Sequence, residues 1–208
     1  MERRLAAVLV SDVVGYTKLM EEDTEGTVTA WSEARDKIIE PSVESHKGRI
    51  VKFTGDGFLT EFKTVQDALN CAIHLQNSLF ESPLKFRMAV NLGDIIDDGR
   101  DIHGEGINIA ARLEALAEPG GICISGAVYD QVRNRINAKY EELGFQDVKN
   151  VSEPVMAYNV SAKINLGEET KPENLAGDLS IAVLPFDNMS NDPEQEFFTD
   201  GIVEDIIT

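Results

Sequence analysis

Two aspartates, Asp12 and Asp56, have the clearest potential for chemistry in this sequence. Asp12 follows the apolar run LAAVLVS, and Asp56 lies in TGDG between two alternating segments. If those segments pair beside the first run, the two carboxylates converge, and a cation between them relieves their repulsion. Divalent ions such as Mg²⁺ take oxygen ligands of this kind together with water and substrate phosphates. We therefore expect a divalent-metal site, although each aspartate alone is also an ordinary turn or helix-cap residue.

Polar residues elsewhere could bind a nucleotide. Asn108 and Arg112 lie four apart in GEGINIAARLEAL, which puts both on one helix face. The guanidinium fork of Arg112 suits a phosphate, and Asn108 could hold a ribose oxygen or orient the arginine. For an isolated pair of this kind, a solvated polar face is the more common explanation. Lys52 is expected on the same strand face as Ile50, where an edge-strand lysine is common, and Asp101 reads as a loop acid.

A glycine follows Asp12 in VSDVVGYT. Gly15 would let backbone N–H groups at Gly15, Tyr16 and Thr17 face a phosphate at the start of a helix. A single glycine is also typical of a simple turn, so this pattern by itself decides little.

Apolar periodicity predicts the elements that position these residues. The strongest local signal is a hairpin, because RIVKF and FLTEF alternate on either side of Asp-Gly. The predicted order is a buried strand over 5–11, a helix from about Thr17 to Glu44 containing Pro41, the hairpin, a helix over 65–80, a strand over 86–96, a helix over 105–117, a strand over 121–125, a helix capped by Ser125 with the stripe Val128, Val132 and Ile136, and two final strands over 140–148 and 155–161. This β-α-β-β-α-β order predicts an α+β fold of ferredoxin-like type, with helices flanking a mixed, largely antiparallel sheet.

Composition excludes several classes of partner. The chain has 208 residues and a net charge of −18, so we expect no nucleic-acid partner and no anionic membrane surface. No stretch reaches the length of a membrane span, and the chain is expected to be cytoplasmic. Cys71 and Cys123 are expected to be buried thiols.

Residues 1–160 are predicted to form one domain, 161–177 a polar linker, and 178–208 the start of a second domain.

Four stretches together resemble the class III adenylyl and guanylyl cyclase catalytic domain across roughly residues 5–160. They are VSDVVGYT, RIVKFTGDGFLTEF, DIHGEGINIAARL and GFQDVKNVSEPVMAY. The resemblance implies a bacterial adenylate cyclase that converts ATP to cyclic AMP and pyrophosphate. It also implies two Mg²⁺ or Mn²⁺ ions per site and a homodimer with shared active sites. Residues 178–208 are similar to the start of a TolB-like segment.

The resemblance assigns roles by position. It implies that Asp12 and Asp56 from one chain bind the metals, helped by the Val13 carbonyl, and that the other chain reads adenine with Lys52 and Asp101. The further implied roles are ribose orientation by Asn108, transition-state stabilisation by Arg112 and triphosphate binding by Lys149. Tyr16 stands where such domains usually have Phe, and NLGDIIDDGRDIHG resembles a shortened dimerisation arm.

Two other functions remain open at this point. An inactive cyclase-homology domain could act as a nucleotide-binding or dimerising module, although such a domain would be free to lose Asp12, Asp56, Asn108 or Arg112, and all four are present. A guanylate cyclase of this family typically carries Glu and Cys in place of Lys52 and Asp101, and neither occurs here.

Overall fold

The computed structural model describes residues 1–147 and 153–161, all within a compact unit that spans 1–164. The expected linker and second domain lie outside the described residues, except Ser161, which ends the last strand. Lys149 also lies outside them. Within the described ranges, no helix combines the length and apolarity needed to cross a bilayer.

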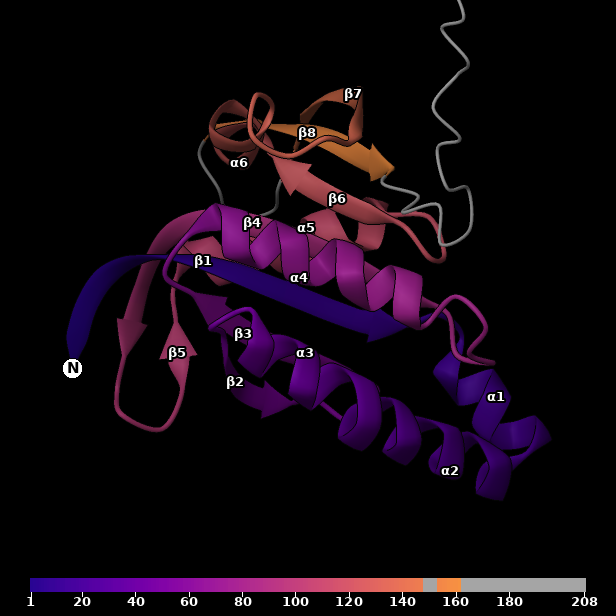
Figure 1. The fold of residues 1–208 in the computed structure, drawn as a ribbon. Helices are drawn as coiled ribbons and strands as arrows, with labels where there is room; N and C mark the ends of the chain where they lie inside the picture. Colours follow the sequence, from indigo (N-terminus) through magenta and orange to yellow (C-terminus); the bar gives the residue numbers. More distant parts are fainter. Residues whose placement is uncertain (148–152, 162–208) are drawn as a thin grey trace, which may run out of the picture. The chain divides into compact units, whose positions relative to one another are not determined.

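The first half of the sheet has the predicted ferredoxin-like topology (Figure 1). Strand β1 (Glu2–Val13) is central, with β3 (Gly57–Phe62) and β4 (Phe86–Asp97) antiparallel on its two sides. β2 (Arg49–Phe53) pairs with β3 as the predicted hairpin. The resulting order, β2-β3-β1-β4, places the TGDG turn beside the end of β1.

The second half extends the sheet beyond β4. The order continues as β4-β6-β8-β7, with β6 (Ile122–Ser125) parallel to β4. β8 (Val155–Ser161) and β7 (Lys139–Gln146) are antiparallel additions. The short β5 (Ile102–His103) pairs with the end of β4. The sheet is therefore mixed, as expected.

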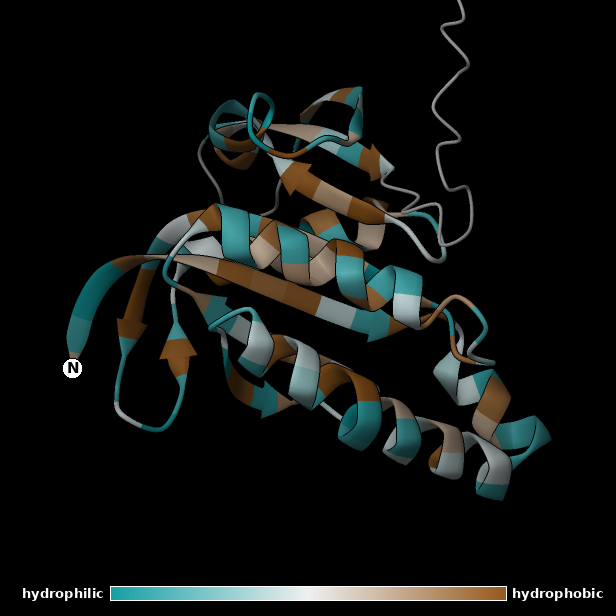
Figure 2. Cartoon of the chain, in the orientation of Figure 1, coloured by the Kyte–Doolittle hydropathy of each residue, from teal (hydrophilic) through white to brown (hydrophobic). Residues whose placement is uncertain are grey.

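Helices cover both faces of β1 because its apolar residues point both ways. Ala7 and Leu9 pack in the core with α4 (Val65–Ser78), whereas Ala6 and Val8 pack with α5 (Glu105–Leu116) on the other face. Figure 2 shows this apolar run along the middle of β1, with hydrophilic residues at its two ends. A strand buried on both faces reads as a continuous apolar run.

The long helix predicted from Thr17 to Glu44 is wrong as a single helix. The segment contains α1 (Tyr16–Glu22), α2 (Thr24–Ala34), a π-helical turn η1 (Arg35–Ile39) and α3 (Glu40–Ser45). Asp23 interrupts it, because its backbone is extended and its carboxylate accepts the Gly26 N–H at 2.9 Å. The π-helical turn ends two residues before Pro41, which has no N–H for a regular helical bond.

Two smaller predictions concern α6 (Gly126–Val132) and the cysteines. Ser125 stands at the N-cap of α6 as predicted, but its side chain makes no capping hydrogen bond. Its hydroxyl is instead buried without a partner among the described residues. Cys71 and Cys123 are buried free thiols, and burial raises the pKa of each to about 12. Both are therefore unreactive core residues.

Two glycines set the distance between α5 and the sheet. A Cβ on Gly93 of β4 would lie 2.6 Å from the Cα of Gly106 in α5, so only glycine permits this approach. The buried Asn91 side chain adds a hydrogen bond of 2.9 Å to the Gly106 carbonyl. The backbones of α5 and β4 are therefore in direct contact, which fixes the position of the α5 side chains.

We expect Gly93→Ala to lower the free energy of unfolding by about 1–3 kcal/mol, because the new methyl group meets backbone that cannot rotate away. Chemical denaturation measures this change. Glu105→Ala, at an exposed position beside Gly106, should leave the stability within about 0.5 kcal/mol of the unmodified chain. Equal stability of the two variants would show that α5 is free to shift.

Candidate active site

Asp12 and Asp56 are brought together by strand pairing. Asp12 lies opposite Gly57 in the β1–β3 register, and the Val13 N–H donates to the Asp56 carbonyl at 3.0 Å. The pKa of Asp12 is raised, first by partial burial and then by the neighbouring Asp56 carboxylate. The convergence predicted from the sequence is thus present in the structure.

The turn that carries Asp56 depends on two glycines. Gly55 has a φ of 93°, and the Thr54 N–H closes the turn on the Gly57 carbonyl at 2.9 Å. A Cβ on Gly57 would lie 2.2 Å from the Ser11 carbonyl oxygen. TGDG therefore serves both the tight turn and the close packing of that turn against β1.

Arg87 and Glu114 complete this end of the sheet, and the sequence analysis missed both. Arg87 of β4 faces Asp12 in the register, with its Nη2 3.6 Å from Asp12 Oδ2. Its Nε lies 2.8 Å from Glu114 Oε1 of α5, as an ion pair whose N–H is not aligned on the oxygen. Burial raises the pKa of Glu114, and Arg87 opposes that rise. The sequence offered a signal for Glu114, because it lies four residues after Ala110 and so falls on the apolar, buried face of α5.

The donor set at this end suits a hard divalent ion. No cluster of three or more His, Cys, Asp or Glu with metal-site geometry occurs in residues 1–147 and 153–161. Two carboxylates leave the other coordination positions to water, backbone carbonyls and substrate phosphates, which is the usual way proteins bind Mg²⁺. Repulsion between Asp12 and Asp56 favours a cation here. Val13, the predicted carbonyl ligand, has its side chain in the core.

The Gly15 segment has a mixed outcome. Gly15 has a φ of 68° immediately before α1, which explains the glycine. Gly15 and Thr17 are exposed, whereas Tyr16 is half-buried and packs against the main core. A packing role thus accounts for the Tyr16 ring, and the phosphate contact of these backbone N–H groups stays a prediction.

Lys52 and Asp101 meet although they lie far apart in sequence. Lys52 Nζ of β2 donates to Asp101 Oδ2 at 2.5 Å. Asp101 lies directly before β5. This bond is the main cause of the lowered pKa of Asp101. The prediction that Lys52 and Ile50 share a strand face is wrong, because the register of β2 shifts between them. Ile50 packs on the α4 side of the sheet. Lys52 pairs with Leu59, which faces the α5 side.

Asn108 and Arg112 lie on the outer face of α5. Both are exposed, and neither side chain has a hydrogen-bond or ion-pair partner in the described part of the chain. Arg112 is two residues from Glu114, which corresponds to about 200° around the helix. Because Glu114 faces Arg87, Arg112 points away from the aspartates of its own chain. The structure therefore brings together two pairs, Asp12 with Asp56 and Lys52 with Asp101, and leaves Asn108 and Arg112 facing outward.

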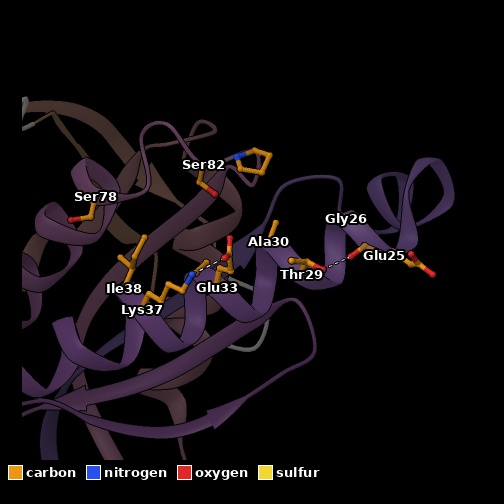
Figure 3. Close-up of a pocket in the computed structure, with 11 residues that line it drawn as sticks. Glu25, Gly26, Thr29, Ala30, Glu33, Lys37, Ile38, Ser78 and Ser82 are labelled. Carbon is orange, nitrogen blue, oxygen red and sulfur yellow. Dashed lines mark hydrogen bonds and ion pairs between the residues drawn. The ribbon is translucent and has the colours of Figure 1, made fainter.

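A surface hollow of about 490 Å³ lies elsewhere, between α2, η1 and residues 78–83 (Figure 3). None of the predicted site residues that the structure describes lines it. Lys37 and Glu33 at its wall pair with each other at 2.6 Å, so this cation is already neutralised. The volume alone gives no reason to place the chemistry there.

Comparison with known sequences identifies the family. A family model described as "Adenylate and Guanylate cyclase catalytic domain" matches residues 3–162. The protein named "Putative adenylate cyclase 3" of Rhizobium meliloti (strain 1021) is 43% identical over 222 residues, covering 100% of this chain and 38% of the relative. "Adenylate cyclase" of Glutamicibacter nicotianae is 32% identical over 130 residues, covering 62% of this chain and 32% of the relative. The chain thus spans less than half the length of these relatives.

Solved structures agree with the fold. A structure described as an adenylate/guanylate cyclase/hydrolase from Silicibacter pomeroyi is 37% identical, with a TM-score of 0.73, and the match covers 77% of this chain and 98% of that chain. The adenylyl cyclase CyaB from P. aeruginosa is 26% identical, with a TM-score of 0.68, and the match covers 80% of this chain and 100% of that chain.

We expect Asp12→Asn to raise Tm by on the order of 2 °C at pH 8 in EDTA. Because the pKa of Asp12 is raised on folding, the folded state holds this proton more tightly than the unfolded chain. Its ionised form therefore costs stability above that pKa, and the cost fades as the pH falls through the raised pKa toward the ordinary value. The gain from Asp12→Asn should shrink in the same direction. Thermal unfolding followed by circular dichroism measures both effects.

Asp98→Ala is the control of opposite sign. The pKa of Asp98 is lowered to about 2, mainly by the N–H groups of Asp101 and Arg100. Its ionised form stabilises the fold above the ordinary carboxyl pKa, and that stabilisation is lost as the pH falls through about 2. Asp98→Ala should therefore lower Tm at pH 8. A Tm for Asp12→Asn at or below that of the unmodified chain would contradict the assigned repulsion.

Proposed function

Because the chain belongs to the adenylate and guanylate cyclase catalytic domain family, we propose that it is an adenylate cyclase domain. It converts ATP to 3′,5′-cyclic AMP and pyrophosphate at a site shared by two copies of the chain. The observation that carries the choice of ATP is the bond between Lys52 and Asp101. The donor and the acceptor needed at the base lie side by side.

The base edge distinguishes the two nucleotides. Adenine presents an acceptor at N1 and a donor at its N6 amino group, which match the ammonium of Lys52 and the carboxylate of Asp101. Guanine reverses this order, so it would leave both side chains facing groups of the wrong kind. A site built to pair with one base rejects the other by the cost of those unpaired polar groups.

Asp12 and Asp56 support the proposed position of the ATP triphosphate in the site. In the reaction, the ribose 3′-hydroxyl attacks the α-phosphate in line, and pyrophosphate leaves. Asp12 and Asp56 would hold two Mg²⁺ or Mn²⁺ ions, which would supply activation of the attacking oxygen and neutralisation of the triphosphate. Arg87, 3.6 Å from Asp12, places a further positive charge at this end. The protein itself mainly positions the reacting groups.

The direction of α5 supports a site shared between two copies of the chain. Asn108 and Arg112 face away from the aspartates of their own chain, while Glu114 faces toward them. In a twofold dimer, the outward face of one α5 can reach the aspartates of the other copy, giving two equivalent sites. Asn108 then orients the ribose, and Arg112 stabilises the charge that develops on the α-phosphate.

Incubation with ATP and Mn²⁺ tests the activity directly. We expect cyclic AMP, with a kcat/KM for ATP at least roughly tenfold above that for GTP, because guanine leaves polar groups unpaired. Lys52→Glu combined with Asp101→Cys should reduce or reverse this preference. Chromatography of the products measures both rates. Equal wild-type rates with ATP and GTP would refute the assignment of the base pocket, and the absence of any cyclic nucleotide would favour an inactive regulatory domain.

A mixture of two inactive variants tests the shared site. Asp12→Ala and Arg112→Ala should each abolish activity alone. In a mixed dimer both lesions can fall in one site and leave the other intact. Random mixing makes about half of the dimers mixed, and each mixed dimer has one intact site of its two. Activity should therefore recover to about a quarter of the wild-type value.

Subunit exchange must be shown separately, for example by energy transfer between labelled copies. Asp12→Ala mixed with Asp56→Ala is the matched control, because both lesions affect the same half of the site and leave neither site whole. Exchange without recovery in the first mixture, or equal recovery in both mixtures, would contradict the shared-site arrangement.

A further inference from the structure

Strand β2 holds the β4–β5 turn at both of its ends. Lys52 of β2 bonds to Asp101, just before β5, at 2.5 Å. Arg49, three residues earlier in β2, bonds through Nη2 to Asp97 Oδ2, the last residue of β4, at 3.0 Å. The turn between Asp97 and Asp101 is therefore tied to the same strand twice.

The register shift in β2 makes this double attachment possible. Residues three apart in a regular strand point to opposite faces of the sheet. Here Arg49 pairs with Glu61 and Lys52 with Leu59, and these partners are two apart in β3 and share a face. The irregularity at Val51 thus turns both cations toward the turn. Without it, only one of them could reach.

Arg49 is itself held in place by a network of ion pairs. Glu61 accepts from Arg49 Nε at 2.8 Å and from Arg4 Nη2 at 2.7 Å. Asp97 Oδ2 accepts from Arg4 as well, at 3.2 Å. The side chains of Glu61 and Asp97 are only 11% and 20% exposed, so solvent screens these pairs less than it would on an open surface.

A series of hydrogen bonds from side chains to backbone N–H groups connects Asp97 to Asp101 along the turn. Asp97 Oδ1 accepts the Gly99 N–H at 2.8 Å. Asp98 Oδ1 accepts the N–H groups of Arg100 at 2.9 Å and Asp101 at 2.8 Å. Asp101 Oδ1 in turn accepts the Ile102 N–H at 2.7 Å, which leaves its Oδ2 directed at Lys52.

We infer that Arg49, acting through Asp97, is a positioning residue for recognition of the nucleotide base. Arg49 fixes the turn that presents the Asp101 carboxylate. It does not itself contact the nucleotide base, which Lys52 and Asp101 would bind. The inference rests on the proposed function, since it assigns the turn to base selection. Loss of Arg49 should loosen the acceptor while leaving Lys52, Asp12 and Asp56 in place.

Arg49→Ala tests the inference against a matched control, Arg3→Ala. Arg3 also pairs with an acid of β4, Asp94, at 2.6 Å, but that acid lies outside the turn. For Arg49→Ala we expect a threefold to fivefold rise in KM for ATP and a similar fall in the ATP-to-GTP ratio of kcat/KM. The changes should be of about this size because the lost ion pair is partly exposed. The kcat should stay near the wild-type value. Arg49→Lys should recover part of the ratio, and Arg3→Ala should change none of these values.

Hydrogen exchange of the nucleotide-free protein gives a second readout. Amides of residues 97–103 should exchange roughly fivefold faster in Arg49→Ala and at the wild-type rate in Arg3→Ala. The inference requires both changes, so an unchanged nucleotide ratio or an unchanged exchange rate overturns it. A wild-type chain that forms no cyclic nucleotide would refute the proposed function, and with it the assignment of this turn to base selection. The exchange data would then still decide whether Arg49 orders the turn.

Discussion

The antiparallel pairing of β1 with both β3 and β4 is the constraint on which the site depends. β1 is buried on both faces, so its register is fixed by packing as well as by hydrogen bonds. That register brings Asp12 beside the TGDG turn on one side and opposite Arg87 on the other. A slip of one residue would turn Asp12 into the α4 side of the core, where its charge would be very costly.

The features that could be predicted from the sequence are those with local causes. The apolar run before Asp12 is long enough to show a buried strand, and Asp-Gly between alternating segments shows a hairpin whatever lies around it. Together they predicted the convergence of Asp12 and Asp56. The family resemblance, rather than any periodicity, suggested that Lys52 and Asp101 would meet, and the fold brings them into contact across 49 positions of sequence.

The features that escaped prediction depend on tertiary structure or on a single irregular residue. The shift at Val51 reverses the face of Lys52, and the alternation of RIVKF gives no sign of it. Arg87 and Glu114 matter because β4 and α5 lie against each other, which requires Gly93 and Gly106. The helix break at Asp23 was accessible in principle, since an aspartate three residues before Gly26 can cap a helix, but the longer apolar pattern obscured it.

Helix α5 carries groups that face in two directions. Glu114 contacts Arg87 beside the aspartates of its own chain, while Asn108 and Arg112 face outward. In the proposed dimer, one rigid helix therefore belongs to both active sites. A small rotation of α5 about its axis would displace Arg112 in one site and Glu114 in the other at the same time. A signal acting on this one helix in either subunit would then change turnover in both sites together, without any need to alter the affinity of the subunits for each other.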